Sequence, residues 1–262
     1  MKKVALALAS GGPRGFAYIG AIEELQKRGY TITSVAGASA GALVGGIYAA
    51  GGIESFKEWL CGLDPVKVMS LVDFSISRNS IVKGQRVIDT IKKMVPDVNI
   101  EDMKIPFTAV ATDLYTGEEV IFRSGPLFEA IRASISIPSM FAPVKWQGHT
   151  LIDGGIANTF PLNRVQRTEG DILVGFNVNE IDPLMDEHKV FTDTFGSILQ
   201  RSFGLMNSTI ARMGIELNPP DILVSLPYDS YQGVYGYSHA HEIIEKGREL
   251  MAAALDKYQN AF

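Results

Sequence analysis

Gly37-Ala38-Ser39-Ala40-Gly41 sets one serine among small residues, and this stretch decides the fold. A short β-branched run precedes it at residues 33–36, and a helical run follows it. The pattern G-x-S-x-G between a strand and a helix is typical of a nucleophile elbow, a tight turn that lifts a serine hydroxyl into a cleft. The turn crowds the backbone two residues before and two after the serine, so a Cβ at Gly37 or Gly41 would clash.

Three further segments accompany this turn. Ser10-Gly11-Gly12-Pro13-Arg14-Gly15 follows a strand-like run at residues 4–9. A glycine-rich turn between a strand and a helix presents backbone N–H groups that can bind an anion. Leu151-Ile152-Asp153-Gly154-Gly155 ends an apolar run with an aspartate and two glycines. Between them, residues 133–144 read ASISIPSMFAPV.

Together and in this order, the four segments resemble a patatin-like phospholipase. The resemblance runs over residues 4 to about 161, and the chain length is similar to that of the small bacterial members. The resemblance implies that Ser39 is the nucleophile and Asp153 the base, in a Ser-Asp dyad that uses no histidine. It also implies a three-layer α/β/α fold with a mostly parallel central sheet, and a lipid ester as substrate.

The glycine loop resembles that of the family, with one departure. The resemblance implies that the N–H groups of Gly11 and Gly12 form the oxyanion hole, and that Arg14 is the basic residue of the loop. The family often has three consecutive glycines here, whereas Ser10 takes the first place in this chain. Pro13 has no N–H, so the hole must rest on the two glycines. Arg14 either contacts a lipid phosphate or braces the loop through backbone carbonyls, and we favour bracing.

The residues themselves suit acyl transfer, which needs a nucleophile, a base and donors for an oxyanion. A carboxylate can act as the base if it is close and shielded from water, because its pKa then rises towards the working range. Ser39, Asp153 and the amides of Gly11 and Gly12 fill these roles. The simpler alternatives are that Ser39 is a small residue in a tight turn and that Asp153 only forms a turn before glycine. The motifs contain three more glycines, which are Gly15, Gly154 and Gly155.

The sequence lacks the residue patterns of a nucleotide phosphate site, a Ser-His-Asp triad and a metal site. No Lys-Ser/Thr pair follows the glycine loop, and no acidic residue stands about twenty positions beyond a G-x-G-x-x-G, which disfavours a nucleotide phosphate site. His149 would lie ~13 Å from Asp153 along an extended strand, so the two are not a triad pair. No group of His, Asp or Glu has metal-ligand spacing, so we expect no metal and no cofactor. The other histidines are His188, His239 and His241.

The composition excludes several partners. The formal net charge of −5 and the pI of about 5.4 leave no electrostatic footprint for nucleic acid and argue against strong general attraction to anionic bilayers. The single cysteine, Cys61, excludes an internal disulfide and is expected to be a small buried residue. The apolar run at residues 4–9 is shorter than the ~7–15 residues of a signal-peptide core, so we expect a cytoplasmic protein.

Residues 35–53 carry no charge over nineteen positions, about the length of a membrane span. Twelve of these nineteen residues are Gly or Ala, and no basic cluster flanks them. A strand, an elbow and a buried helix explain the segment better, so we expect no transmembrane segment.

Strand-like runs alternate with helical patterns along the chain, which indicates a mostly parallel sheet covered on both faces. The nucleophile and the glycine loop then both follow carboxyl ends of strands. With no repeat or long linker, we expect a single domain, 1–262. Strands are expected at 4–9, 33–37, 107–112, 118–122, 143–152, 171–178 and 221–226. Helices are expected at 16–28, 85–95, 126–133 and 195–213, and after a Ser238 cap near the C-terminus.

Two apolar segments bear on the substrate. Residues 53–80 form either a lid or apolar wall for acyl chains, or an ordinary packed helix and loop. The Met-bearing stripe at 195–213 is more typical of core than of a lipid groove. We expect a serine hydrolase acting on carboxylic esters of phospholipids or lysophospholipids, a substrate compatible with peripheral membrane contact. The alternative is a lipid- or protein-binding regulator that keeps the fold without meaningful turnover.

Overall fold

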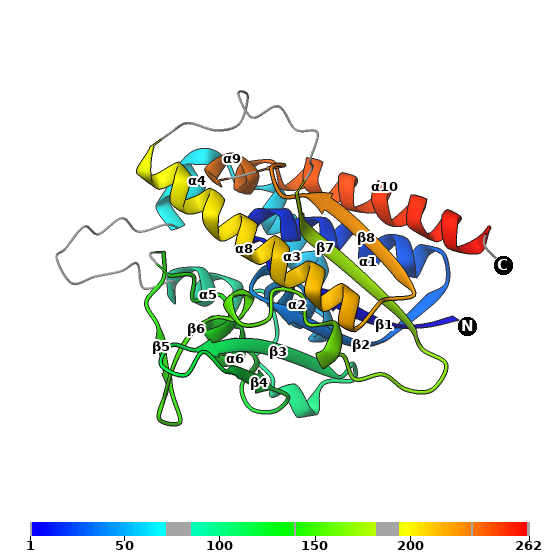
Figure 1. Ribbon diagram of the computed structural model, residues 1–262, viewed down its shortest axis with the longest axis horizontal. Coiled ribbons are helices and arrows are strands. Elements are labelled where there is room, and N and C mark those ends of the chain that lie inside the picture. Colours follow the sequence, from blue (N-terminus) through cyan, green and yellow to red (C-terminus); the bar gives the residue numbers. More distant parts are fainter. Residues whose placement is uncertain (1, 72–84, 139, 182–193, 232, 261–262) are drawn as a thin grey trace.

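A mixed sheet of eight strands forms the centre of the computed structural model, which describes residues 2–71, 85–138, 140–181, 194–231 and 233–260 (Figure 1). The strands follow the order β5-β6-β3-β2-β1-β7-β8, and β4 pairs with β3. The pairs among β3, β2, β1, β7 and β8 are parallel, whereas β4, β5 and β6 form antiparallel pairs. The strands are β1 (Lys2–Leu8), β2 (Tyr30–Ala38), β3 (Phe107–Asp113), β4 (Glu119–Phe122), β5 (Val144–Trp146), β6 (His149–Asp153), β7 (Ile172–Glu180) and β8 (Ile222–Pro227).

Helices cover both faces of this sheet. α1, α2, α6 and α10 contribute to a large core on one face, and α8 packs over a smaller core on the other, which gives three layers (Figure 1). The α-helices are α1 (Ala17–Lys27), α2 (Ala40–Ala49), α3 (Ile53–Cys61), α4 (Pro65–Leu71), α5 (Gln85–Ile91), α6 (Leu127–Ser134), α8 (Phe195–Leu217), α9 (Gly233–Ser238) and α10 (Ala240–Gln259). Short 3-10 helices occur at Gly12–Phe16, Ile100–Asp102, Gly154–Ile156 and Leu162–Arg164.

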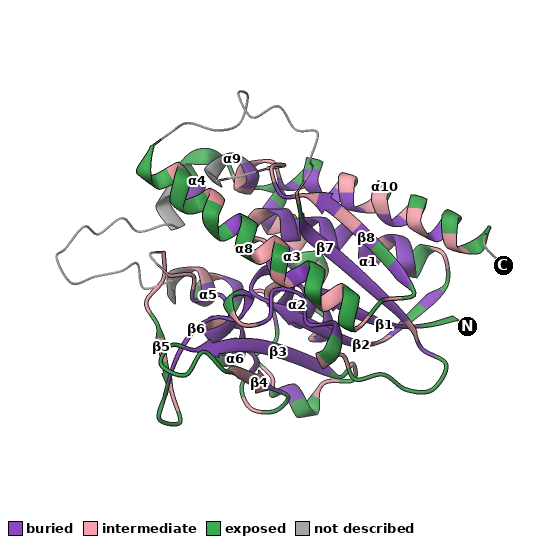
Figure 2. Ribbon diagram, viewed as in Figure 1, coloured by how far each residue is buried: buried purple, intermediate pink, exposed green. Residues whose placement is uncertain are grey.

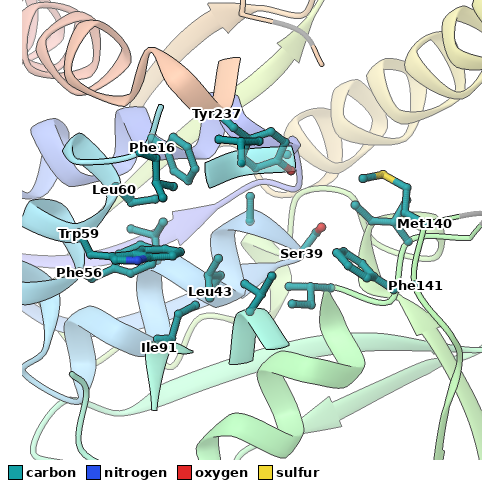
Figure 3. A pocket seen from close by; sticks show the side chains of 18 residues that line it. Phe16, Ser39, Leu43, Phe56, Trp59, Leu60, Ile91, Met140, Phe141 and Tyr237 are labelled. Atoms are coloured by element: carbon teal, nitrogen blue, oxygen red, sulfur yellow. The ribbon is translucent and has the colours of Figure 1, made fainter. Parts of the chain in front are cut away.

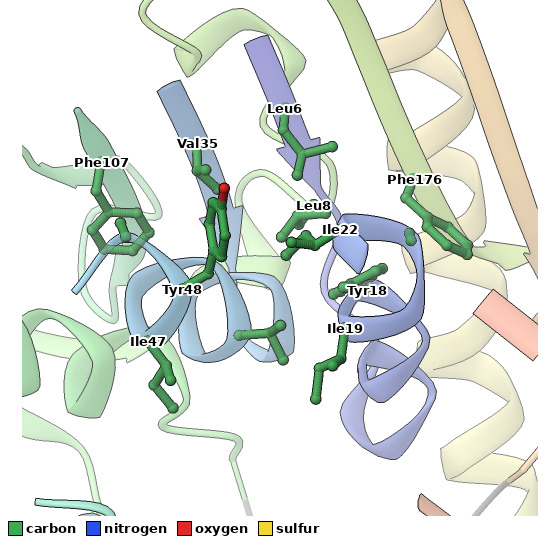
Figure 4. Packing of buried hydrophobic residues seen from close by; sticks show 14 of the residues in the cluster. Leu6, Leu8, Tyr18, Ile19, Ile22, Val35, Ile47, Tyr48, Phe107 and Phe176 are labelled. Atoms are coloured by element: carbon green, nitrogen blue, oxygen red, sulfur yellow. The ribbon is translucent and has the colours of Figure 1, made fainter. Parts of the chain in front are cut away.

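β1 shows why both faces must be covered. Successive side chains of a strand point to opposite faces. Leu6 and Leu8 belong to the large core, where they pack near Tyr18 and Phe176 (Figure 4). The alternate residues Ala5 and Ala7 belong to the smaller core. An apolar run without alternation therefore marks a strand buried on both sides, as the sequence predicts.

Residues 143–152 differ from the prediction of one strand. They form a hairpin, in which β5 and β6 pair across a turn where Gln147 and Gly148 have φ of 46° and 86°. Two positive φ values are typical of a two-residue hairpin turn, because its twist matches that of the flanking strands. The reversal sends β6 back along β3, with Asp153 at its end.

The uncharged residues 35–53 form the end of β2, the turn at Ser39, all of α2 and the start of α3. The predicted strand, elbow and helix are confirmed. No helix in the described ranges is both long and apolar enough to cross a membrane.

The prediction that the 195–213 stripe is core is wrong. In α8 the buried residues are Gly204 and Ala211, and large apolar side chains such as Phe195 and Met206 are exposed. Figure 2 accordingly colours most of α8 as exposed. The helix is amphipathic, but its smallest residues face the sheet.

Two local predictions also fail. Cys61 is exposed at the end of α3, where its thiol is not part of the core. Ser238 ends α9 and does not cap α10, which begins after His239 without a side-chain cap. Of residues 53–80, the structure describes α3 and α4, and residues 72–80 lie outside the described residues.

Candidate active site

The carboxyl ends of β2 and β6 meet on β3. Ala38 pairs with Val110 of β3, and Asp153 pairs with the next residue, Ala111. β4 pairs with both of these β3 residues and so occupies one edge of β3 at this point. β2 and β6 therefore share the other edge and run towards each other. Since Ser39 directly follows Ala38, this arrangement places it beside Asp153.

Ser39 stands at a sharp turn between β2 and α2. Its φ of 50° and ψ of −118° lie in a region that residues other than glycine rarely adopt. A Cβ at Gly37 would lie 2.2 Å from the carbonyl carbon of Gly41. A Cβ at Gly41 would lie 2.2 Å from the carbonyl oxygen of Leu8. The clash predicted at both glycines is confirmed.

A direct hydrogen bond joins the two candidate catalytic residues. Ser39 Oγ donates to Asp153 Oδ2 at 2.6 Å, and Asp153 Oδ1 accepts from the N–H of Gly155 at 2.8 Å. A Cβ at Gly154 would lie 1.9 Å from the carbonyl oxygen of Val110, so only glycine fits directly after the aspartate. Ser39 is 4% exposed and Asp153 is 6% exposed. The structure thus brings together the two residues that the sequence singles out.

Burial changes the acidity of this carboxyl group. It raises the pKa of Asp153 from its ordinary 3.8 to about 6, because the charged form loses its hydration. Hydrogen bonds from Ser39 and the Gly155 N–H favour the charged form and oppose the rise in pKa. Such a group is mostly ionised at pH 7 and accepts a proton more readily than an ordinary aspartate, as a general base must.

Ser134, at the end of α6, supports the turn and was not assigned a role from the sequence. Its Oγ accepts from the N–H of Ser39 at 2.9 Å and donates to the carbonyl oxygen of Val110 at 2.6 Å. The turn is thereby tied to β3, and the Ser39 N–H is already engaged. The only signal in the sequence is the place of Ser134 in the segment 133–144, which contributes to the family resemblance.

The glycine loop follows β1 and adjoins the Ser39 turn. Gly12 has a φ of 56°, and a Cβ at Gly11 would lie 2.1 Å from a side chain of β7. Ser10 anchors the loop: its N–H donates to the carbonyl oxygen of Thr159 at 2.8 Å, and its own carbonyl oxygen accepts from Asn179 Nδ2 at 2.7 Å. Asn179, fully buried in β7, is a second support that sequence reasoning missed.

Two motif glycines allow the three segments to touch. A Cβ at Gly15 would lie 2.6 Å from the Cβ of Ala40, so the glycine loop packs directly on the start of α2. A Cβ at Gly155 would lie 2.6 Å from the Oγ of Ser10, so the turn after β6 packs on the glycine loop. Close approach at these positions holds all three motifs in one site.

Arg14 is buried, with only 7% of its surface exposed. Its Nη1 donates to the carbonyl oxygen of Tyr228, and its guanidinium lies 4.3 Å from the centre of the Tyr228 ring. Burial lowers the pKa of Arg14, because the cation loses hydration. These contacts link the loop to the segment after β8. The carbonyl that accepts from Arg14 lies outside the glycine loop.

His149 does not contact Asp153. Its Nδ1 lies 2.7 Å from Oδ2 of Asp113, at the end of β3. The other oxygen of Asp113 accepts two backbone N–H groups of the turn that follows β3. His188 lies outside the described residues. The remaining histidines lie at the start of α10 and are His239 and His241.

An apolar pocket of about 110 Å³ opens beside Ser39 (Figure 3). Phe56 and Trp59 of α3 lie across this pocket from Met140 and Phe141 (Figure 3). Further lining side chains come from α2, α4 and α5, from Phe16 and from Tyr237 of α9. The described part of 53–80 therefore supplies an apolar wall at the candidate nucleophile.

A larger cleft of about 510 Å³ also reaches Ser39. Asp153, the glycine loop and Tyr237 of α9 line it, together with Leu199 and Phe203 of α8. Its lining is more polar than that of the apolar pocket. Since Ser39 lines both cavities, its hydroxyl stands where an apolar pocket meets an open cleft.

The sequence also matches known proteins. Residues 6–165, about three-fifths of the chain, match the family model described as Patatin-like phospholipase. The chain belongs to the patatin-like phospholipase family, which confirms the resemblance noted from its motifs.

Several curated relatives share this region. An uncharacterized NTE family protein of Mycobacterium tuberculosis (strain ATCC 25618 / H37Rv) is 40% identical over 213 residues, which cover 80% of this chain and 59% of that protein. A patatin-like phospholipase domain-containing protein of Caenorhabditis elegans is 30% identical over 186 residues, 68% of this chain and 14% of that protein. Neuropathy target esterase sws of Drosophila persimilis is 32% identical over 165 residues, 60% of this chain and 11% of that protein. The chain thus spans less than two thirds of the length of these relatives.

A solved structure shares the fold. The crystal structure of VipD from Legionella pneumophila superposes with a TM-score of 0.54 at 17% identity, and covers 98% of this chain and 67% of VipD. The predicted three-layer α/β/α fold with a mostly parallel, patatin-like sheet is confirmed.

Proposed function

We propose that this protein is a serine hydrolase that cleaves carboxylic ester bonds of lipids, with Ser39 as nucleophile and Asp153 as base. One observation carries the proposal: the 2.6 Å hydrogen bond from Ser39 Oγ to a buried carboxylate, at a strained turn beside an apolar pocket. Serine is a weak nucleophile at neutral pH and needs such an adjacent base. Membership of a phospholipase family, and relatives named as a phospholipase-domain protein and an esterase, support the same class of reaction.

In the first half-reaction, Ser39 Oγ attacks the ester carbonyl carbon and its proton passes to Asp153 Oδ2. The carbonyl oxygen becomes an oxyanion, and its donors are the N–H groups of Gly11 and Gly12. The Ser39 N–H already donates to Ser134, and Pro13 has no N–H, so these glycines are the donors we assign. Breakage of the ester C–O bond then releases the alcohol, to which Asp153 returns the proton.

In the second half-reaction, water attacks the acyl carbon on Ser39 and gives a proton to Asp153. The second tetrahedral intermediate collapses, the bond between Ser39 Oγ and the acyl carbon breaks, and Oγ regains the proton. The carboxylic acid leaves, and both side chains return to their starting state. The complete reaction consumes only the ester and one water molecule.

We assign the two cavities to the two halves of the ester. The apolar pocket, walled by Trp59 and Phe141, suits an acyl chain, because burial of hydrocarbon away from water is favourable. The open cleft, with its polar loop atoms, suits the alcohol half. This division favours phospholipids or lysophospholipids over small polar esters.

Three wider assignments belong to the same proposal. Arg14 braces the cleft wall through the Tyr228 carbonyl and does not carry the reaction. Residues 1–262 act as one domain. The protein works in the cytoplasm, where a single unpaired cysteine is compatible with reducing conditions.

A fluorophosphonate probe tests the proposal directly, because it labels only an activated serine. We expect one labelled peptide, containing Ser39. Ser39→Ala should abolish labelling and p-nitrophenyl ester hydrolysis with an unchanged circular dichroism spectrum. Labelling that persists in that variant rejects the assignment, and a wild type that neither labels nor hydrolyses esters supports the binding-regulator alternative.

Product analysis tests the bond that is cleaved. Mass spectrometry of a phosphatidylcholine digest should show free fatty acid and lysophosphatidylcholine, in amounts that EDTA leaves unchanged. Phosphatidic acid or diacylglycerol as the first product would contradict cleavage of a carboxylic ester.

A further inference from the structure

α8 turns its apolar side away from the protein. Among the described residues, eight of the thirteen exposed large apolar side chains lie in this helix. Phe195 is 84% exposed, Met206 57% and Met213 53%. The two buried residues of α8, Gly204 and Ala211, are among its smallest. The helix therefore rests on the protein through these small residues and the partly buried Ile215, and presents most of its large apolar residues to solvent.

The exposed apolar residues share one side of the helix, on which Ser202 and Thr209 are exposed as well. At about 100° per residue, Phe195, Met206 and Met213 project within about 20° of one another around the helix, opposite Gly204 and Ala211. We call these three residues, with Ile198, Leu199, Leu205 and Leu217 beside them, the outward stripe. An amphipathic helix normally directs such a stripe into the core. The opposite orientation here marks the stripe as a contact surface.

Charged residues border this stripe. Arg201 and Arg212 both lie on one flank of α8, about 100–120° from the line of Phe195. Glu216, near the C-terminal end, is the remaining charged residue of the helix. Arg201 is ion-paired with the buried Asp229 at 2.7 Å, so the exposed Arg212 is the cation that this flank offers to a lipid phosphate. An apolar stripe with a cation on its flank is typical of helices that lie in a lipid interface, with hydrocarbon on one side and the cation at the level of the phosphates.

The same helix forms a wall of the candidate active site. Leu199 and Phe203 line the open cleft with Ser39 and Asp153, and they are 43% and 44% exposed. A lipid layer seated on α8 would face the mouth of this cleft directly. A second copy of the chain seated there would instead cover the mouth and obstruct entry of a substrate. The geometry therefore favours a lipid surface as the occupant.

We propose that the outward stripe of α8 is the surface by which this protein docks on a lipid membrane, with the active-site cleft opening onto the bilayer. The inference rests on the proposed lipid hydrolase function, which it extends from the reaction to the physical form of the substrate. Docking would let an ester pass from the bilayer into the cleft without crossing water.

A triple variant tests the docking surface. Phe195→Ser, Met206→Gln and Met213→Gln change three stripe residues that do not line the cleft. The matched control changes three exposed apolar residues elsewhere, at the turn after β3 and in β8: Leu114→Gln, Tyr115→Ser and Leu223→Gln. Both proteins and the wild type are mixed with vesicles of equimolar phosphatidylcholine and phosphatidylglycerol, and vesicle binding is measured by co-sedimentation.

We expect the stripe variant to bind vesicles at least about tenfold more weakly than the wild type, because three apolar side chains no longer enter the interface. Its hydrolysis of vesicle phospholipid should fall in parallel, while hydrolysis of monomeric p-nitrophenyl butyrate stays within about twofold. The control variant should match the wild type in all three assays. Unchanged vesicle binding by the stripe variant, or an equal loss in the control, overturns the proposal.

A gain of signal provides a second readout. Phe195→Trp keeps a large interfacial side chain, and tryptophan favours the membrane–water boundary. Its fluorescence should shift to shorter wavelength on vesicle addition, beyond any change in the wild type, which already contains Trp59 and Trp146. No additional shift would contradict insertion at this position.

The remaining outcomes separate docking from catalysis and from self-association. Ser39→Ala should bind vesicles as the wild type does. If the wild type binds vesicles through α8 but has no esterase activity, the proposed function is rejected and membrane docking is retained. If the wild type is an active esterase that does not bind vesicles, membrane docking is rejected and the proposed function is retained. Sedimentation velocity showing a dimer that the stripe variant dissociates, with vesicle binding unchanged, would assign the stripe to a second copy and overturn the proposal.

Discussion

Ser39 and Asp153 reach each other from opposite directions along one edge of β3. Ser39 follows β2, which runs parallel to β3, whereas Asp153 ends β6, which runs antiparallel to it. The β5–β6 hairpin is therefore what delivers a carboxylate to the end of β2. Because the 2.6 Å hydrogen bond is direct, the arrangement leaves no space for an imidazole between the two groups.

Asp153→Asn should reduce ester hydrolysis by about 10²–10⁴-fold, the usual contribution of proton transfer by a positioned base. Asparagine keeps the shape of the side chain and its acceptor for the Gly155 N–H, so folding should be retained. The measurement is kcat/KM for p-nitrophenyl butyrate. Asp113→Asn is the matched control, since that buried aspartate also stands at the end of a strand, in this case β3, but contacts His149. This variant should stay near the wild-type rate. A loss under tenfold in Asp153→Asn would place the base elsewhere.

The rate should depend on the ionisation of Asp153. Burial raises its pKa to about 6, and only the ionised form can accept the Ser39 proton. We therefore expect kcat/KM to rise about tenfold per pH unit below pH 6 and to level off above it. The profile is measured between pH 4.5 and pH 8, together with the rate of fluorophosphonate labelling. A rate that stays nearly constant down to pH 4.5 would place the pKa near the ordinary 3.8 and contradict a shielded carboxylate.

The same pKa shift predicts a stability effect. In the unfolded chain Asp153 ionises near 3.8 and in the folded protein near 6, so folding becomes less favourable as the pH rises through that window. Above pH 6 the penalty is about 2–3 kcal/mol, at 1.36 kcal/mol per pKa unit. Asp153→Asn removes it. The free energy of unfolding in urea should therefore rise by about this amount at pH 8 and change little at pH 4. A variant less stable than the wild type at pH 8 would contradict this.

Much of the site follows from local sequence. The elbow is local, because Gly37, Ser39 and Gly41 alone specify a turn that excludes a Cβ at two positions. The glycine loop is local for the same reason. The motif around Asp153 identifies this residue in the sequence. The sequence does not predict how Asp153 comes to lie beside Ser39, since it predicts one strand where the β5–β6 hairpin occurs. Strand reversal depends on two residues, Gln147 and Gly148, whose positive φ has only a weak sequence signature.

Support for the site was harder to predict. Ser134 and Asn179 act through hydrogen bonds to backbone atoms of segments up to 95 and 169 residues away in sequence. The periodicity of apolar residues in the sequence does not predict such contacts, because they depend on tertiary packing. The orientation of α8 was missed for a related reason: its stripe has the period of a helix, and periodicity identifies an apolar face without saying what covers it. Gly204 and Ala211 were the small-residue signal that could have shown which side touches the protein.

Catalysis should not require histidine. His149 is committed to Asp113, and a Ser-His-Asp triad would need an imidazole in contact with both Ser39 and the acid. Replacing each of the four histidines in turn by Gln or Asn should leave kcat within about tenfold, equivalent to ~1.4 kcal/mol in the barrier. The variants are assayed with p-nitrophenyl butyrate and checked for folding by circular dichroism. One folded variant that binds substrate without turning it over would require a triad around that histidine.

Ser134 should be a positioning residue for the Ser39 turn. Ser134→Ala leaves the Ser39 N–H and the Val110 carbonyl without their partner in a site that is fully buried. An unsatisfied buried group costs about 1–3 kcal/mol, and here the cost falls on a turn already held at a positive φ. We therefore expect lower stability together with a fall in kcat of about tenfold or more, with KM little changed, because the hydroxyl of Ser39 loses its alignment.

Ser136→Ala is the control for this prediction. Ser136 is equally buried and lies two residues away, but its hydroxyl exchanges hydrogen bonds with Arg132 and does not contact the turn. Its replacement should lower the free energy of unfolding by a similar amount while kcat stays near the wild-type value. If both variants lose kcat equally at equal stability, Ser134 contributes only to packing. If Ser134→Ala alone slows fluorophosphonate labelling, the hydrogen bond from the Ser39 amide is part of what makes that serine reactive.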